Sequence, residues 1–214
     1  MLKDIVIIGA GGHAKEIAFL IDAINLEQST WNLLGFIEKE PSEIGRMNGR
    51  YSVVADESFF KTFQNELNVV VAIGNPQKVR SIYSGLMKEF PNLKFPNLIH
   101  PSINIDPRDL SLEIGNIICA GNIFTTDISI GSFNCLNRAC NISHDVKIGD
   151  FCTINPGANI SGGVNIQDAC LIGTGSTILQ YLTVGESSIV GAGAVVIKDV
   201  LPKTMVVGVP AKEH

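Results

Sequence analysis

The sequence is poor in charged and aromatic residues. Charged residues make up 17% and aromatic residues 7% of the 214 residues, and the net charge is −5. An average soluble domain carries charges on roughly 25% of its residues, and nucleic-acid binders usually show a basic face. The negative charge therefore argues against nucleic acid as a partner. The hydrophobic content of 45% is enough for a sizeable core, which excludes a disordered chain.

Long apolar runs and a disulfide pattern are also missing. No run approaches the roughly 20 residues of a membrane-spanning helix, so no membrane insertion is expected. The five cysteines are odd in number and include no C-x-x-C pair. This usage favours reduced thiols and a cytoplasmic location.

The first hundred residues alternate short apolar runs with amphipathic stretches. The runs at 5–8, 33–37 and 69–73 are continuously apolar, as expected of strands buried on both faces. Residues 14–21 and 79–86 carry apolar residues at helical spacing. The alternation predicts a Rossmann-like βαβ domain with a small parallel sheet over residues 1–97.

The second half has a period of six residues. Stepping by six from Ile118 to Val196 meets a large apolar residue at all fourteen positions. This period fits neither an α-helix nor ordinary hairpins, but it fits a parallel β-helix in which three six-residue sides form one coil. We therefore predict a β-helix over residues 98–214. Glycines after the repeat residue, such as Gly131 and Gly149, are expected at corners that need relaxed backbone angles.

A second series of small or aliphatic residues lies two positions before each repeat residue. Cys140, Cys152 and Cys170 belong to this series, so we expect them to pack as small hydrophobes inside the prism. Cys119 and Cys135 lie outside it; they are candidates for surface thiols, and we assign them no role. Three asparagines interrupt the series: Asn116, Asn122 and Asn134.

Three segments of the chain resemble a known family. The hexapeptide 148–153, which begins Ile-Gly-Asp, and the ending 207–212, Val-Gly-Val-Pro-Ala-Lys, are similar to left-handed β-helix acyltransferases. Residues 8–15, Ile-Gly-Ala-Gly-Gly-His-Ala-Lys, narrow the resemblance. The whole chain then resembles the sialic-acid O-acetyltransferase-like family of sugar acetyltransferases, and within it the nucleotide-sugar N-acetyltransferases of the bacillosamine pathway.

This resemblance implies an activity and an assembly. The acyl donor would be acetyl-CoA, and the acceptor would be a nucleotide-linked 4-amino sugar, with UDP as the expected nucleotide. The protein would be a cytoplasmic homotrimer whose active sites lie between neighbouring prisms. The prism would be left-handed, against the usual right-handed rule for parallel crossovers.

His144 is the candidate general base. It lies two residues past a repeat isoleucine, so it is expected outside the apolar interior. The resemblance places the base here, followed by an acidic residue, which is Asp145. A neutral imidazole can take the proton that an attacking amine loses near pH 7, and a carboxylate at the ring would favour the imidazolium. No cysteine is well placed as a nucleophile, so we expect direct transfer.

The resemblance also implies residues that bind acetyl-CoA. Gly162, one coil above His144, is expected to offer a backbone N–H to the thioester oxyanion. Thr153 stands where some family members carry a second histidine, which is a departure from the pattern. The expected acetyl-CoA-binding residues are Thr153, Gly162, Thr174 and Ala192.

The glycine-rich loop fits the dinucleotide fingerprint G-x-G-x-x-G/A between a strand and a helix. Only about 97 residues precede the prism, roughly one mononucleotide half, so a nucleoside diphosphate fits the loop better than NAD. Glu38-Lys39 stands where family members often have an Asp pair. The resemblance implies that Gly11, Gly12, His13 and Asn137 bind the nucleotide sugar. Glu38, Lys39, Gly74 and Asn75 are further expected substrate-binding residues, because they follow strands where open α/β sheets bind ligands.

Three other functions share some of these features. A γ-type carbonic anhydrase has the same prism, but its zinc needs three histidines and the repeat region holds only His144, so no metal is expected. A sugar O-acetyltransferase of the sialic-acid type would use the same base on a hydroxyl group. A non-catalytic sugar-nucleotide-binding module is the third alternative.

Overall fold

The computed structural model describes residues 1–63 and 66–214, which form two compact units. One unit contains residues 1–74 and 81–98, and the other contains residues 75–80 and 99–214. The domain boundary that we expect between residues 97 and 98 stays a prediction, because compactness alone does not show that a unit folds independently.

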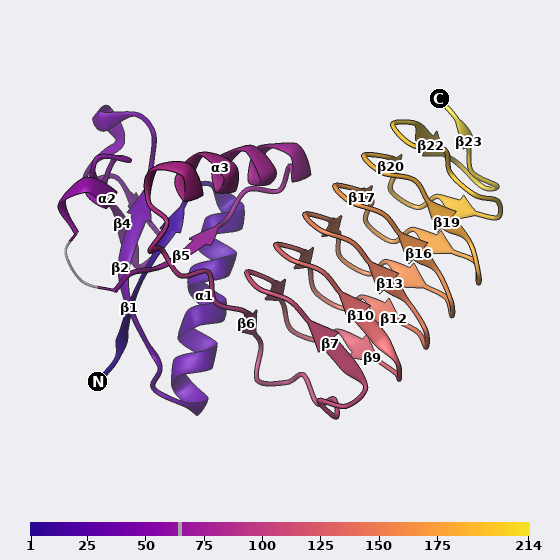
Figure 1. The fold of residues 1–214 in the computed structure, drawn as a ribbon, viewed down its shortest axis with the longest axis horizontal. Coiled ribbons are helices and arrows are strands. Elements are labelled where there is room, and N and C mark those ends of the chain that lie inside the picture. The colour runs from indigo at the N-terminus through magenta and orange to yellow at the C-terminus, as the bar shows by residue number, and fades with distance from the viewer. Residues whose placement is uncertain (64–65) are drawn as a thin grey trace. The chain divides into compact units, whose positions relative to one another are not determined.

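The first unit is an α/β domain with a five-stranded sheet in the order β3-β4-β2-β1-β5 (Figure 1). Only the β3–β4 pair is antiparallel. The strands are β1 (Lys3–Ile8), β2 (Trp31–Ile37), β3 (Met47–Asn48), β4 (Tyr51–Ala55) and β5 (Asn68–Val71). The helices are α1 (Gly12–Glu27), η1 (Pro41–Glu43), α2 (Phe59–Thr62) and α3 (Pro76–Glu89), of which α3 begins in the second unit.

The predicted Rossmann-like domain is confirmed. Residues 5–8 of β1 and all of β5 are buried, as their continuous apolar runs predict. Strands β2 and β5 lie on opposite sides of β1, so the order in which the strands are added to the sheet reverses at β1. Open α/β sheets bind ligands at the carboxyl ends of strands beside such a reversal. The short elements β3, β4 and α2 were not predicted.

The second unit is a parallel β-helix of three sheets, whose strands pair with strands eighteen residues away (Figure 1). Side one contains β6 (Leu98–Ile99), β8 (Ile117–Ile118), β11 (Cys135–Leu136), β14 (Thr153–Ile154), β17 (Leu171–Ile172), β20 (Ile189–Val190), β22 (Met205–Val207) and the antiparallel β23 (Lys212–Glu213). Side two contains β9 (Ile123–Phe124), β12 (Asn141–Ile142), β15 (Asn159–Ile160), β18 (Thr177–Ile178) and β21 (Val195–Val196). Side three contains β7 (Leu110–Leu112), β10 (Ile128–Ile130), β13 (Lys147–Ile148), β16 (Asn165–Ile166) and β19 (Thr183–Val184).

The repeat residues fill the interior of the prism, as predicted. All of them are at most 3% exposed except Phe124, which is half-buried. Residues 128–206 contribute one continuous hydrophobic cluster, which includes Cys140, Cys152 and Cys170. Burial raises the pKa of the Cys140 thiol to about 11, which matches its expected part as a small apolar residue.

Our prediction that Gly131 and Gly149 supply relaxed backbone angles at the corners is wrong. Left-handed backbone recurs three positions before each repeat residue, from Gly115 to Gly193, with φ between +56° and +74°. Gly131 and Gly149 are not among these residues. A Cβ on either glycine would instead overlap the carboxylate of an aspartate in the next coil. These two glycines are therefore required by close approach and not by their backbone angles.

The three asparagines continue the small-residue series and do not interrupt it. Each is at most 6% exposed. The Asn122 side chain accepts a hydrogen bond from the Cys140 N–H at 3.0 Å and donates one to the Cys119 carbonyl at 2.8 Å. Asn116 accepts in the same way from the backbone N–H eighteen residues later. The side chains therefore join successive coils at the corners.

The structure excludes the interpretation of Cys119 and Cys135 as surface thiols. Both side chains are 7% exposed. Cys135 lies in β11 between Ile117 and Thr153, which are each 4% exposed, so the outward row of side one is itself covered here. In the described part of the chain, no disulfide joins any of the five cysteines.

Replacing Asn122 by alanine should destabilise the prism. The change leaves the buried Cys140 N–H and Cys119 carbonyl without their side-chain partner, which should lower the free energy of unfolding by about 1–3 kcal/mol. Asn141→Ala is the matched control, because Asn141 is exposed and its side chain donates to the Asn159 side chain instead of to a buried backbone group. Denaturant titration should show a loss below about 0.5 kcal/mol for the control. Equal losses in both variants would contradict the assignment.

Candidate functional site

His144 and Asp145 lie together at the corner between β12 and β13. The imidazole Nδ1 is 2.8 Å from Asp145 Oδ2, and the His144 side chain is 50% exposed. Asp145 has φ of +60°, the left-handed conformation that recurs at the corners. A carboxylate that accepts the Nδ1–H proton leaves the Nε2 lone pair of a neutral imidazole available. The pair therefore has the geometry of an oriented base.

The ring of His144 lies against Gly162, one coil further along the prism. A Cβ at Gly162 would overlap the imidazole Cε1 and Nε2 atoms, so only glycine lets the ring take this position. At another corner, Ser132 and Asp150 lie two residues past a repeat residue, as Gly162 does. Their N–H groups donate to the side chains of Asp150 and Asp168 at 2.7 and 2.9 Å. Among the described residues, the Gly162 N–H has no such acceptor. It can donate to a ligand oxygen beside the imidazole.

The other residues expected to bind acetyl-CoA lie away from His144 in this chain. Thr174 and Ala192 are exposed and stand eighteen residues apart at the corner between sides one and two. Asn137 lies at the same corner, is 9% exposed and donates to the Asn155 side chain at 3.4 Å. Thr153 is buried in β14. Strands of side two separate this corner from that of His144.

The glycine loop ends β1 and leads into α1. Gly11 is the N-cap of α1, and no side chain caps this helix end or places an acidic group in its first turn. A Cβ at Gly11 or Gly12 would meet nothing within 4 Å. Asn48 holds the loop by donating to the Gly11 carbonyl at 2.9 Å. The first N–H groups of α1 are therefore accessible to an anion such as phosphate.

Glu38, which follows β2, bonds to the glycine loop. Its Oε1 atom accepts a hydrogen bond from the Ala10 N–H at 2.6 Å, which commits one loop donor within the protein. Lys39 follows it and is exposed. Gly74 and Asn75 follow β5, and the Asn75 side chain accepts from the Lys78 N–H at 3.0 Å near the start of α3.

His13 lies in the first turn of α1. Its Nδ1 atom is 3.6 Å from Glu16 Oε2. Desolvation by burial lowers the pKa of His13 below its ordinary value, and the Glu16 carboxylate opposes this shift. At neutral pH, His13 therefore presents a neutral imidazole beside the loop and not a cation.

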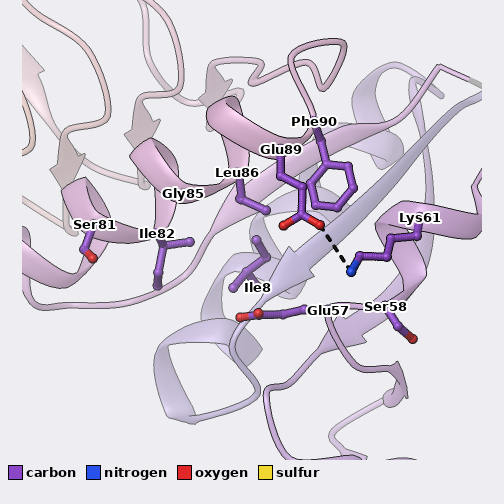
Figure 2. Close-up of a pocket in the computed structure, with 10 residues that line it drawn as sticks. All are labelled: Ile8, Glu57, Ser58, Lys61, Ser81, Ile82, Gly85, Leu86, Glu89 and Phe90. Carbon is purple, nitrogen blue, oxygen red and sulfur yellow. Dashed lines mark ion pairs between the residues drawn. The ribbon is translucent and has the colours of Figure 1, made fainter.

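A cleft of about 350 Å³ opens between α2 and α3 (Figure 2). Ile8, the last residue of β1, lies in its wall with Leu86 and Phe90, which gives the cleft an apolar side. Lys61 of α2 and Glu89 of α3 form an ion pair of 3.2 Å across the cleft. The position at the carboxyl end of β1 suits a ligand of the sheet edge. Sequence reasoning missed this cleft because α2 is too short to give a helical period.

The chain is similar to known proteins in both of its units. Residues 4–86 match the family model of the PglD N-terminal domain. PerB from Caulobacter crescentus, solved with CoA and GDP-perosamine, is 27% identical with a TM-score of 0.87 over 100% of this chain and 98% of that one. A mutant of perosamine N-acetyltransferase from the same bacterium, with the same two ligands, is 26% identical with a TM-score of 0.85 over the same shares.

The acetyltransferase domain of PglB from Neisseria gonorrhoeae, in complex with acetyl coenzyme A, is 29% identical with a TM-score of 0.87 over 100% of both chains. No curated protein sequence matches this chain significantly. The likeness confirms the expected left-handed β-helix and its order after the α/β domain.

Residues 1–63 and 66–214 contain neither a membrane-spanning helix nor a cluster of metal ligands. No helix there is long and apolar enough to cross a bilayer. No group of three His, Cys, Asp or Glu side chains there is arranged to hold a metal ion.

The lowered pKa of His13 can be tested by NMR titration of its imidazole, assigned with a His13→Gln variant. We expect a value below 6.5, and Glu16→Gln should lower it further because the carboxylate favours the imidazolium. Below pH 6.5 the unfolded chain then binds more protons at this residue, so its contribution to the free energy of unfolding falls as the pH falls. A pKa at or above 6.5 would contradict the burial argument.

Proposed function

We propose that this chain, an acyltransferase with a PglD N-terminal domain and a left-handed β-helix, acetylates the amino group of a nucleotide-linked amino sugar with acetyl-CoA. The observation that carries the proposal is the His144–Asp145 pair, whose imidazole packs on Gly162. The relatives solved with CoA or acetyl-CoA support the donor. A UDP-linked 4-amino sugar is the acceptor we expect, and the GDP-perosamine of the Caulobacter structures makes a GDP-linked sugar the alternative.

The proposed reaction is a direct transfer. His144 Nε2 takes a proton from the sugar amine as the nitrogen attacks the thioester carbon. The Gly162 N–H stabilises the negative charge that develops on the carbonyl oxygen. The C–S bond then breaks, and the imidazolium returns the proton to the CoA thiolate. Asp145 holds the ring and stabilises the imidazolium between these two steps.

The first unit is the proposed site for the nucleotide. The accessible N–H groups at the start of α1 suit the diphosphate, and the neutral His13 beside them can add a hydrogen bond. The cleft between α2 and α3 offers the apolar wall and the polar groups that a nucleobase needs (Figure 2). Glu38, Lys39, Gly74 and Asn75 stay candidates for contacts to the nucleoside.

We also propose a cytoplasmic homotrimer. Asn137, Thr174 and Ala192 lie at a different corner from His144 in one chain. If these residues bind the two substrates, a neighbouring prism must bring that corner to His144. A site shared between copies is then the arrangement that uses every predicted residue.

Replacing His144 by glutamine should lower kcat by at least about 100-fold, because glutamine cannot accept the proton. Asp145→Asn should lower it by about tenfold, since the ring keeps a hydrogen-bond acceptor but loses the charge that stabilises the imidazolium. Asparagine tolerates the left-handed backbone of Asp145, so the fold should be retained. Thermal unfolding checks this. Turnover near the wild-type value in His144→Gln would remove His144 as the base.

The acceptor can be identified by measuring thiol release from acetyl-CoA with UDP-, GDP- and dTDP-linked 4-amino sugars and with their hydroxyl analogues. Release with one amino sugar and not with its hydroxyl analogue is the expected result, and it also identifies the nucleotide. Release with hydroxyl sugars alone would establish O-acetylation instead. No release with any acceptor would favour a non-catalytic binding module.

A further inference from the structure

Tyr181 shares a corner with the proposed catalytic pair. Asp145, Gly163 and Tyr181 stand eighteen residues apart and all have left-handed φ angles of +60°, +67° and +60°. Hydrogen bonds join the three coils here, from the Gly163 N–H to the His144 carbonyl at 2.8 Å and from the Tyr181 N–H to the Gly162 carbonyl at 2.9 Å. Tyr181 therefore has a fixed position two coils beyond Asp145.

The rings of His144 and Tyr181 converge on two consecutive glycines. The imidazole lies against Gly162 from the preceding coil. The phenol lies against Gly163 from the following coil, where a Cβ would overlap its Cδ1 atom and come within 2.6 Å of Cε1. Gly162 and Gly163 thus form a surface on which both rings rest, and a molecule held at Gly162 lies beside both.

The exposure of Tyr181 needs an explanation. Its side chain is 73% exposed, and a bulky residue in the left-handed region is unfavourable. Phe133 and Phe151 hold equivalent positions at another corner, but they are buried and stack at 5.4 Å. Among the described residues, Tyr181 is the one aromatic side chain left exposed at a left-handed corner. A ligand that covers the ring would offset this cost.

We propose that Tyr181 binds the acyl donor, with its ring packed against the acetyl-thioester end of the pantetheine arm. This proposal rests on the proposed function. The acceptor amine must lie at His144, and the thioester oxygen at the Gly162 N–H. Tyr181 lies one coil beyond Gly162, on the side away from His144. In sequence it falls between Thr174 and Ala192, the other residues expected to bind acetyl-CoA, and therefore at their level along the prism. The apolar thioester end suits an aromatic face.

The test uses three variants of the full chain. Tyr181→Asn removes the ring but keeps a residue that tolerates the left-handed backbone. Tyr181→Phe keeps the ring and removes only the hydroxyl. Asp127→Asn is the matched control, because Asp127 is exposed at the same corner with φ of +56° and lies one coil before Asp145. Unfolding midpoints equal to the wild type show that each variant is folded, and Tyr181→Gly replaces the asparagine variant if it is not.

The measurements are calorimetric titrations with CoA and with UDP and GDP, together with the KM for acetyl-CoA. Tyr181→Asn should weaken CoA binding and raise this KM by about tenfold, as expected for the loss of a tyrosine anchor. Tyr181→Phe should stay within about twofold, and nucleotide affinity should not change in any variant.

Two results would overturn the proposal while leaving the proposed function intact. One is wild-type CoA affinity in Tyr181→Asn, and the other is a loss of nucleotide affinity alone. If the wild-type chain binds no CoA, the proposed function fails as well. The control should match the wild type throughout, and a tenfold loss in Asp127→Asn would assign the effect to the corner backbone and not to the ring.

Discussion

Pairing between residues eighteen apart is the constraint on which the prism depends. Within each of the three sides, a strand between the two ends pairs with the strands one coil before and after it, so its side chains have fixed neighbours in both coils. Interior residues stack into one hydrophobic cluster, and corner residues stack into columns along the edges of the prism. The column of Asp145, Gly163 and Tyr181 is a direct result of this register. The proposed site therefore requires no distortion of the regular coil.

The interior could be predicted from the sequence because only apolar residues fit it. The period of six predicts the buried face and the exposure of His144. The corners could not be predicted in the same way, because glycine serves two purposes in this repeat. Gly163 supplies left-handed backbone, whereas Gly149 leaves room for the next coil, and a sequence shows the same letter for both. The polarity of Asn122 also suggested that it interrupts the small-residue series. Its side chain is in fact buried, where it bonds to the Cys140 N–H and the Cys119 carbonyl.

The sequence predicted the proposed catalytic pair but not all parts of the proposed site. The motif around His144 predicts a base, and the short distance from its ring to Asp145 agrees with the oriented-base geometry. Counting by eighteen shows in addition that Tyr181 shares the corner of Asp145 and that Thr174 does not. This arithmetic was available from the sequence, which predicts a coil of eighteen residues, and the strand pairing confirms that coil length. The cleft between α2 and α3 had no such signal, since it depends on tertiary packing of short elements.

Two consecutive glycines connect the regular coil to the proposed chemistry. Gly162 has ordinary backbone angles and is required because the imidazole lies against it, while Gly163 has φ of +67° and also carries the ring of Tyr181. A side chain at either position would overlap one of these two rings. Ser132 lies two residues past a repeat residue, as Gly162 does, but its N–H donates a hydrogen bond to the Asp150 side chain. By contrast, no described side chain accepts a hydrogen bond from the Gly162 N–H, which lies at the same corner as both rings.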